Sequence, residues 1–448
     1  MTENIEIRPL APSERHFAHV EYYAGYVVRV SGQLDLDALA KAYRALLHNY
    51  PILGARIEVT ATGYSFMTSG SVPEISVIDG DPERVAGETT LDQSTSLSGL
   101  AVVHNGETAS TTLFVHHSIA DGHHGLAVFN ELWSYYTEIT AGRQVAERVR
   151  AYPRPVEELL IARGVKKLAL PEFADTPAPE VTSLSNPAGV GTDTVTAPEF
   201  DLSARQTDPL PGDDFTGPRT TRIRLSKEQT AAITALCHVE QVTINGMIGG
   251  AILLAHAETR GVGLTELLYC YPVDLRTKVA PPIDLTEGTN VVGSGFYQPT
   301  ENNAGVLDLA REICATLDAG LAAGLVQQGP LQFAETPGGS DNFLMPPGMV
   351  FGTNVGRVSP MRTPLGLRIT DFYITHISNA DRVTERRLEA LGDGAVVFHT
   401  YDDQLSIEAA DSPVIVSRIA ATLHSAIRTS ESERGSAKKP LAAVVLHH

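Results

Sequence analysis

The chain has 448 residues, 43% of them hydrophobic and 19% charged, so it is long enough for two or three domains and too apolar for wholesale disorder. Its 34 basic and 53 acidic residues give a formal net charge of −19, which disfavours nucleic-acid binding because phosphates repel an acidic surface. The three cysteines, Cys237, Cys270 and Cys314, lie far apart and form no CxxC pair, which argues against a disulfide framework and against a cysteine-based zinc site.

The sequence contains no membrane or secretion signal that we can identify. The first fifteen residues include acids and no apolar run, so no signal peptide is expected. The longest strongly apolar stretch, Met247 to Ala255, is far shorter than the ~20 residues that span a bilayer. We therefore expect a soluble, cytoplasmic protein without a membrane span.

The first 140 residues show the pattern of mixed α/β structure. A strand is predicted over 23–30, and Asp35 is expected to cap a helix whose apolar face consists of Leu36, Leu39, Tyr43, Leu46 and Leu47. Short strands are predicted at 57–60, 64–67 and 74–77. Two further strands, at 100–104 and 110–115, flank an Asn105-Gly106 turn and predict a hairpin. A helix after Gly122 is predicted from the spacing of Leu126, Phe129, Leu132, Trp133 and Tyr136.

The composition changes between 171 and 218, where eight prolines and nine acids accompany a single base. This segment is predicted to be a linker or crossover, and we expect it to gate acceptor entry. Helices are predicted beyond it at about 226–238, 244–259, 304–325 and 413–428, and strands at about 222–225, 266–273, 348–354, 367–376 and 394–409. The expected organisation is therefore an N-terminal half (1–170), the linker (171–218), a C-terminal half (219–430) and a tail (431–448).

The most informative motif is His116-His117-Ser118-Ile119-Ala120-Asp121-Gly122, at the end of a predicted strand. Neighbouring residues of a strand point to opposite faces, so only one of the two histidines can face a given cleft. An imidazole titrates near neutral pH and suits a general base that takes a proton from a hydroxyl or an amine. Gly122 permits a close or unusual backbone geometry, and Asp121 can lock the turn through an ion pair.

The motif also allows two other interpretations. The histidines could be purely structural, or the cluster of His116, His117, Asp121, His123 and His124 could bind a metal ion. Metal ligands must converge on one point, whereas neighbouring residues diverge, so no metal site is predicted. The flanking Asp121 and Gly122 favour catalysis over a structural role.

The HHxxxDG motif on a strand-to-helix turn resembles the signature of the condensation-domain acyltransferase superfamily, whose fold consists of two chloramphenicol-acetyltransferase-like α/β domains with the active-site channel between them. Within this superfamily, the chain is more similar to the polyketide-associated acyltransferases of the phthiocerol/phthiodiolone dimycocerosyl transferase type than to the other members. The similar stretches cover nearly the whole chain except 171–218 and the tail, and they are Leu10–His16, Gly32–Leu47, Pro51–Leu53, His116–Gly125, Tyr271–Arg276, Ala280–Pro282, Thr289-Asn290, Gln327-Gln328 and Met361–Pro364.

This resemblance implies residue roles. His117 would be the general base that deprotonates a hydroxyl for attack on an acyl thioester, while His116, Asp121 and Gly122 would be structural, with Arg276 as the candidate ion-pair partner of Asp121. The DFGWG signature of the superfamily is absent. The segment Gly352–Arg357 lies about where that signature would fall, so Asn354 and Gly356 are candidates for the channel or oxyanion region.

The expected reaction is transfer of an acyl group from acyl-CoA or an acyl carrier protein, such as that of a polyketide synthase, to a hydroxyl of a polyketide or lipid, without metal or redox cofactor. No GxSxG elbow is present, so no covalent acyl-enzyme is implied. Three alternatives remain: an N-acylating condensation-type enzyme, an inactive condensation-fold module that recruits carrier proteins, and a hydrolase.

The stretch between 143 and 167 is unexpectedly basic for so acidic a chain, with seven bases against three acids. It could be an ordinary solvated surface. Our hypothesis is that it docks an anionic donor, either the phosphates of coenzyme A or an acidic carrier-protein helix, through Arg150, Arg154, Arg163, Lys166 and Lys167.

Overall fold

The computed structural model describes residues 5–61, 63–70, 73–83, 91–168, 220–335, 348–378, 395–410 and 412–437. The segment predicted as a linker, 171–218, lies outside the described residues, and so does the tail from 438 onward. Within the described ranges, no helix combines the length and the apolarity needed to cross a membrane.

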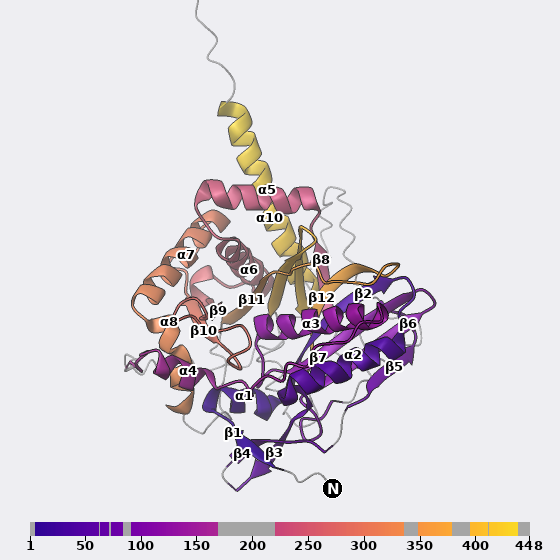
Figure 1. The fold of residues 1–448 in the computed structure, drawn as a ribbon. Coiled ribbons are helices and arrows are strands. Elements are labelled where there is room, and N and C mark those ends of the chain that lie inside the picture. Colours follow the sequence, from indigo (N-terminus) through magenta and orange to yellow (C-terminus); the bar gives the residue numbers. More distant parts are fainter. Residues whose placement is uncertain are drawn as a thin grey trace, which may run out of the picture.

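The first lobe is built on a five-stranded sheet with strand order β12-β2-β7-β6-β5, and helices α2 and α3 lie side by side over it (Figure 1). Asp35 caps α2 by accepting a hydrogen bond from the Ala38 backbone N–H (2.9 Å), as its position predicts. Apolar residues of α2 and α3 pack with the sheet into one buried core. The elements are β2 (Tyr22–Ser31), α2 (Leu36–Asn49), β5 (Ile75–Asp79), β6 (Ser98–Asn105), β7 (Thr108–His116), α3 (Gly122–Thr140) and β12 (Arg368–Ser378).

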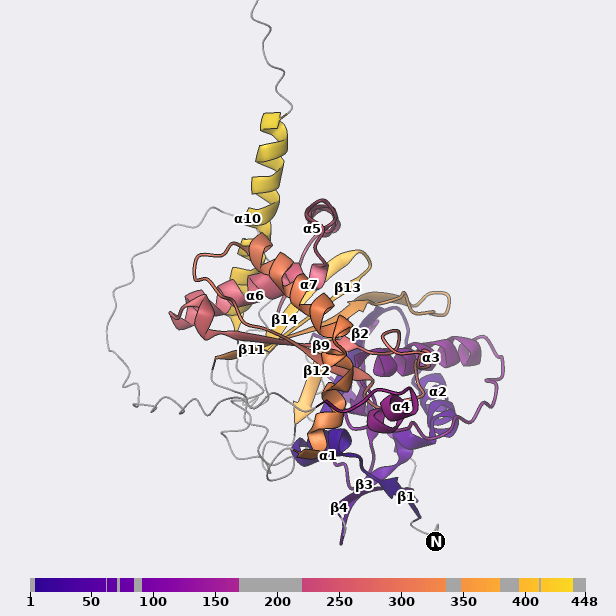
Figure 2. The same cartoon turned by 90° about the vertical axis from the view of Figure 1, so that its left-hand side faces the viewer.

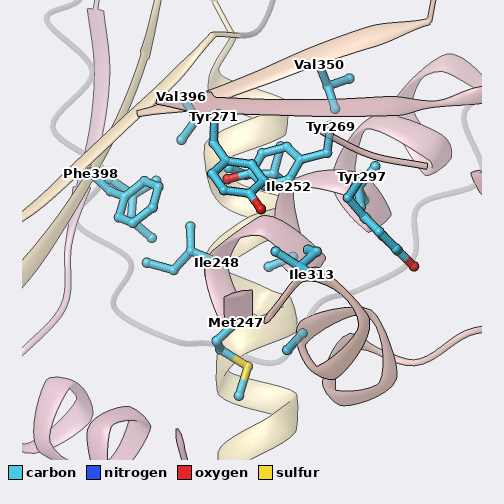
Figure 3. Packing of buried hydrophobic residues seen from close by; sticks show 14 of the residues in the cluster. Met247, Ile248, Ile252, Tyr269, Tyr271, Tyr297, Ile313, Val350, Val396 and Phe398 are labelled. Atoms are coloured by element: carbon cyan, nitrogen blue, oxygen red, sulfur yellow. The ribbon is translucent and has the colours of Figure 1, made fainter. Parts of the chain in front are cut away.

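The second lobe contains a six-stranded sheet with strand order β10-β9-β11-β13-β14-β8. Its core includes the stacked rings of Tyr269 and Tyr271, whose centroids lie 5.0 Å apart, and Figure 3 shows them beside Ile248, Ile252 and Ile313. The elements are β8 (Thr220–Arg224), α5 (Lys227–Glu240), α6 (Ile244–Arg260), η2 (Leu264–Glu266), β9 (Leu268–Asp274), β10 (Val292–Tyr297), α7 (Val306–Ala322), α8 (Leu325–Gln328), η3 (Gly329–Glu335), β11 (Met349–Arg357), β13 (Val396–Tyr401), β14 (Gln404–Ala410) and α10 (Pro413–Ala437).

Smaller elements lie at the base of the first lobe in Figures 1 and 2. A three-stranded sheet of order β1-β4-β3 consists of one strand that precedes β2 in sequence and two strands that follow α2, and α1 lies beside this sheet in Figure 1. Helix α4 instead packs against the core of the second lobe. The elements are β1 (Glu6–Pro9), α1 (Pro12–Val20), η1 (Pro51–Gly54), β3 (Arg56–Thr60), β4 (Gly63–Met67) and α4 (Val156–Ala162). The sequence pattern did not predict β1, α1, α4 or β10.

Strand β12 joins the two lobes, because it follows β11 in sequence and pairs antiparallel with β2 from Arg368↔Ser31 to Ser378↔Tyr22. Asp371 on this strand accepts hydrogen bonds from Arg222 and Arg224 of β8, and Arg29 of β2 lies 3.5 Å from it. One carboxylate thus contacts guanidinium groups from both large sheets.

The predicted fold class, two α/β lobes, is confirmed by this architecture. Most of the strands and helices predicted from periodicity are present, and the helix predicted over 413–428 continues to Ala437. The single strand predicted over 394–409 is wrong, because β13 and β14 form a hairpin there. Asp402 and Asp403 make the turn with φ of 47° and 60°, a conformation that aspartate tolerates better than most residues.

We predict that Asp371→Asn lowers the free energy of unfolding by about 3 kcal/mol, because the change leaves three arginines without their buried counter-charge. Asp371 is only 7% exposed. The matched control is Asp308→Asn, which breaks an exposed pair with Arg311 and should cost less than about 1 kcal/mol. Urea unfolding of both variants is the measurement, and equal losses would contradict the prediction.

Candidate active site

The HHxxxDG motif spans the end of β7 and the first residue of α3, so its histidines are held by sheet backbone. His116 points into the first lobe, where it is fully buried; its Nδ1 lies 2.7 Å from Ser118 Oγ and its ring meets Tyr23 edge-on at 4.7 Å. Burial, together with the nearby His117, lowers the pKa of His116 to about 3. The ring therefore stays neutral near pH 7.

His117 faces the opposite way and is partly accessible. Its ring stacks on Phe17 of α1, with centroids 4.2 Å apart and planes 18° from parallel. Its backbone N–H donates to the Tyr22 carbonyl oxygen (2.8 Å), which fixes the chain at the end of the sheet. The two adjacent histidines thus diverge, as the strand geometry predicts.

Asn290, from the second lobe, makes two hydrogen bonds with His117. Its Nδ2 donates to the His117 carbonyl oxygen (2.6 Å), and its Oδ1 lies 2.9 Å from His117 Nδ1. A carbonyl can only accept, so the amide orientation is determined, and Oδ1 must accept from Nδ1–H. The neutral ring therefore has its lone pair on Nε2, for which no hydrogen-bond partner is found among the described residues.

The surroundings of His117 keep it neutral. Burial lowers its pKa below the ordinary value of 6.5, although its own backbone, Asp121 and the Asn290 hydrogen bond act in the opposite direction. A neutral imidazole with an unprotonated Nε2 can accept a proton from a hydroxyl or an amine.

Asp121 links the turn to the second lobe. Its Oδ1 caps α3 by accepting from the backbone N–H groups of His123 and His124 (3.0 Å each), and its Oδ2 accepts from Arg276 and from the Val291 N–H (2.8 Å each). Burial alone would raise its pKa, but the Arg276 charge and these hydrogen bonds hold the pKa below the ordinary value. The carboxylate is thus charged, and both of its oxygens accept hydrogen bonds that hold the turn and the second lobe in place.

Arg276 is 4% exposed, so it is not a solvated strand-end charge. Its guanidinium contacts Asp121 (2.8 Å), Asp274 (3.0 Å) and the Leu285 carbonyl oxygen (3.1 Å). The structure therefore brings together Asp121 and Arg276, the ion pair that the family resemblance implied.

Gly122 begins α3 with no positive φ, and its Cβ position would lie 4.0 Å from Val355 Cγ1. A Cβ at 122 would thus fit in ordinary van der Waals contact, and the position requires neither an unusual backbone nor a close approach. Gly125 is different, because a Cβ there would come within 2.0 Å of the Tyr26 hydroxyl.

The candidate channel residues Asn354 and Gly356 lie in a bulge of β11 beside the first turn of α3. Gly356 has a φ of 79°, and its N–H donates to Asn354 Oδ1 (2.8 Å). The Asn354 side-chain Oδ1 therefore holds the bulge.

The predicted docking residues do not form one unpaired basic surface. Arg150 pairs with Glu131 (3.1 Å), Arg154 with Glu158 (2.6 Å), and Arg163 with Glu287 (3.2 Å). Arg163 also donates to the Pro281 and Pro282 carbonyl oxygens, which ties α4 to the second lobe. Lys166 and Lys167 are exposed.

No group of three or more metal-binding side chains is found in the described part of the chain. His124 is buried against the Gly288 carbonyl oxygen (3.1 Å), and His123 lies 3.9 Å from Asp274. The five side chains considered as a metal cluster thus have separate partners. These are Ser118 for His116, Asn290 for His117, Arg276 for Asp121, Asp274 for His123 and the Gly288 carbonyl oxygen for His124.

Sequence reasoning did not assign roles to Phe17 and Asn290. Asn290 is 173 residues from His117, and the one signal that pointed to it was the Thr289-Asn290 stretch of the family resemblance. Phe17 was missed because the sequence pattern did not predict α1, the helix that carries it.

The comparisons with known proteins first establish the class. The fold matches the first condensation domain of the CDA synthetase, with a TM-score of 0.58, 14% identity and coverage of 95% of this chain and 97% of that one. It matches polyketide synthase associated protein 5 from Mycobacterium tuberculosis more strongly, with a TM-score of 0.72, 29% identity and coverage of 97% and 100%. The chain is an HHxxxDG protein of the condensation-domain fold.

The sequence comparisons then define the family. Residues 215–410 match the family model described as phthiocerol/phthiodiolone dimycocerosyl transferase C-terminus. The phthiocerol/phthiodiolone dimycocerosyl transferase of Mycobacterium leprae is 35% identical over 375 residues, covering 82% of this chain and 85% of that protein. The Mycobacterium ulcerans protein of the same name is 30% identical over 370 residues, with the same coverage. The chain belongs to this family of acyltransferases.

We predict that Asp121 and Arg276 are energetically coupled. Asp121→Asn and Arg276→Met should each lower the free energy of unfolding by about 3 kcal/mol, because each leaves a buried charge without its partner. The double variant should lose about 1–2 kcal/mol less than the sum of the single losses. Denaturant unfolding of the four proteins is the measurement, and strict additivity would contradict the coupling.

Proposed function

We propose that the protein transfers an acyl group from a phosphopantetheine thioester to a hydroxyl of a polyketide or lipid. The observation that carries this proposal is the reciprocal pair between His117 and Asn290, which leaves the Nε2 lone pair for a substrate. The hydroxyl acceptor is supported by the names of the relatives, which describe acylation of phthiocerol and phthiodiolone.

In the proposed reaction, His117 Nε2 takes the acceptor proton as the hydroxyl oxygen attacks the thioester carbonyl carbon. The C–S bond then breaks, and the imidazolium returns the proton to the departing thiolate. The products are an ester and a free thiol, and no covalent acyl-enzyme forms. The proposed chemistry calls for no metal or redox cofactor, because one imidazole performs both proton transfers.

His117 belongs to the first lobe and Asn290 to the second, so the reacting groups would meet between the lobes. A channel open at both ends would let donor and acceptor reach Nε2 from opposite sides. Both CoA and a carrier protein present the acyl group on the same phosphopantetheine arm, so the proposal names that arm as the shared donor chemistry.

We predict that His117→Ala lowers alcohol-dependent thiol release by about 10²-fold or more. Short and long acyl-CoA donors, and the same acyl groups on a carrier protein, would be tested with and without a long-chain alcohol. Because the pKa of His117 is lowered and only the neutral ring can act, kcat/KM for the alcohol should fall only as the pH drops through a value below 6.5.

Each departure from this result has a distinct meaning. Release that survives His117→Ala would overturn the role of His117. Release without alcohol would indicate a hydrolase, and release that needs an amine would indicate N-acylation. No release from any donor would favour the non-catalytic, carrier-recruiting interpretation.

We further predict that reversing the charges of Arg150, Arg154 and Lys166 to Glu raises the KM for the donor, most steeply at low salt. The matched control is Arg311→Glu, which also breaks exposed ion pairs but lies on α7. An acyl-N-acetylcysteamine donor, which lacks the phosphates and the carrier, should show no change. An unchanged KM for acyl-CoA and acyl-carrier donors would exclude the docking role.

A further inference from the structure

The 287–291 loop of the second lobe brings Asn290 to His117. Thr289, the residue before Asn290, has all of its polar groups hydrogen-bonded. Thr289 has no exposed surface, and each of its three polar groups bonds a different segment of the chain. Its N–H donates to the Arg154 carbonyl oxygen (3.1 Å), its carbonyl oxygen accepts from the Asp121 N–H (3.0 Å), and its hydroxyl donates to Glu14 Oε1 (2.9 Å).

Glu14 is a buried carboxylate at the start of α1, with no exposed surface. Arg8 holds it with two parallel hydrogen bonds of 2.7 Å, one to each oxygen. Its Oε2 also accepts from the Ala11 N–H (2.8 Å), which leaves Oε1 to accept from Thr289. A buried carboxylate is costly unless it is paired and hydrogen-bonded, so this one holds its neighbours in a narrow geometry.

Helix α1 contacts the active site at two points. Glu14 anchors Thr289, and Phe17, one helical turn further along the same face, stacks on the His117 ring. The base is thus held on one side by an aromatic ring of α1 and on the other by Asn290, whose neighbour is bonded to the same helix.

We propose that Glu14 is a positioning residue, which acts through the Thr289 hydroxyl to hold Asn290 in place and thereby keeps the acceptor nitrogen of His117 aimed at the substrate. This inference rests on the proposed function of His117 as the base. Neither Glu14 nor Thr289 touches the reacting atoms, and the proposal requires their effect to pass through Asn290 rather than through Phe17 or Asp121.

The test uses Thr289→Val, which keeps the shape of the side chain and removes only the hydroxyl. We expect kcat for alcohol-dependent thiol release to fall about 10-fold, since small misplacements of catalytic groups cost one to two orders of magnitude, while the donor KM stays within about twofold. Thr289→Ser restores the hydroxyl and should recover most of kcat. Glu14→Gln should lower kcat similarly, because its amide nitrogen replaces one acceptor oxygen.

The control is Thr137→Val on α3, where a buried threonine hydroxyl also bonds another segment, the Arg362 carbonyl oxygen (3.0 Å). This variant should lower the melting temperature without changing kcat. If Thr289→Val behaves like Thr137→Val, the role of Thr289 is merely structural and the proposal is wrong.

The decisive comparison is a double-mutant cycle. Asn290→Ala should lower kcat, and adding Thr289→Val or Glu14→Gln to it should lower kcat by no more than about twofold further. Multiplicative losses would show that Glu14 and Thr289 do not act through Asn290. His117→Ala separates the two claims: if it retains activity, the proposed function fails, and if only the cycle fails, the positioning role alone is lost.

Discussion

The buried ion pair between Asp121 and Arg276 is the constraint on which the rest of the site depends. Removing two charges from water is expensive, and their attraction compensates only when the geometry is good and the remaining polar atoms are satisfied. Here Asp121 receives four hydrogen bonds, and Arg276 binds Asp274 as well. Such a pair tolerates little displacement. Its main effect is therefore to fix the position of one lobe relative to the other.

The relative placement of the lobes decides where His117, the proposed base, meets Asn290. The Val291 N–H bonds the same Asp121 oxygen as Arg276 does, and Asn290 directly precedes it. The ion pair thus places the loop, and the loop places the amide against His117. Three distant parts of the sequence thus converge on His117: the 287–291 loop defines its tautomer through Asn290, the HHxxxDG turn carries it, and α1 stacks Phe17 on its ring.

The sequence was informative wherever local rules applied. The capped helices, the hairpin and the divergence of His116 and His117 follow from periodicity and backbone geometry, and the two-lobed fold followed from the motif's resemblance. Long-range relations could not be predicted in this way. Asn290 contacts His117 across 173 residues, and β12 pairs with β2 although it follows the second sheet's β11. The hairpin at Asp402-Asp403 was missed because no glycine or asparagine marks its turn.

The Asn290 amide beside His117, the proposed base, has a chemical consequence that a carboxylate would not have. A carboxylate hydrogen-bonded to Nδ1 would stabilise the imidazolium and raise the pKa of His117, so that more of the ring would be protonated at neutral pH. Asn290 orients the ring without adding charge, and the charge of Asp121 is already balanced by Arg276. Burial outweighs the Asn290 hydrogen bond and the Asp121 charge, and it lowers the pKa of His117 below 6.5. For the base proposed above, the arrangement thus favours a neutral ring with a lowered pKa over a more basic ring that would be protonated to a larger extent at neutral pH.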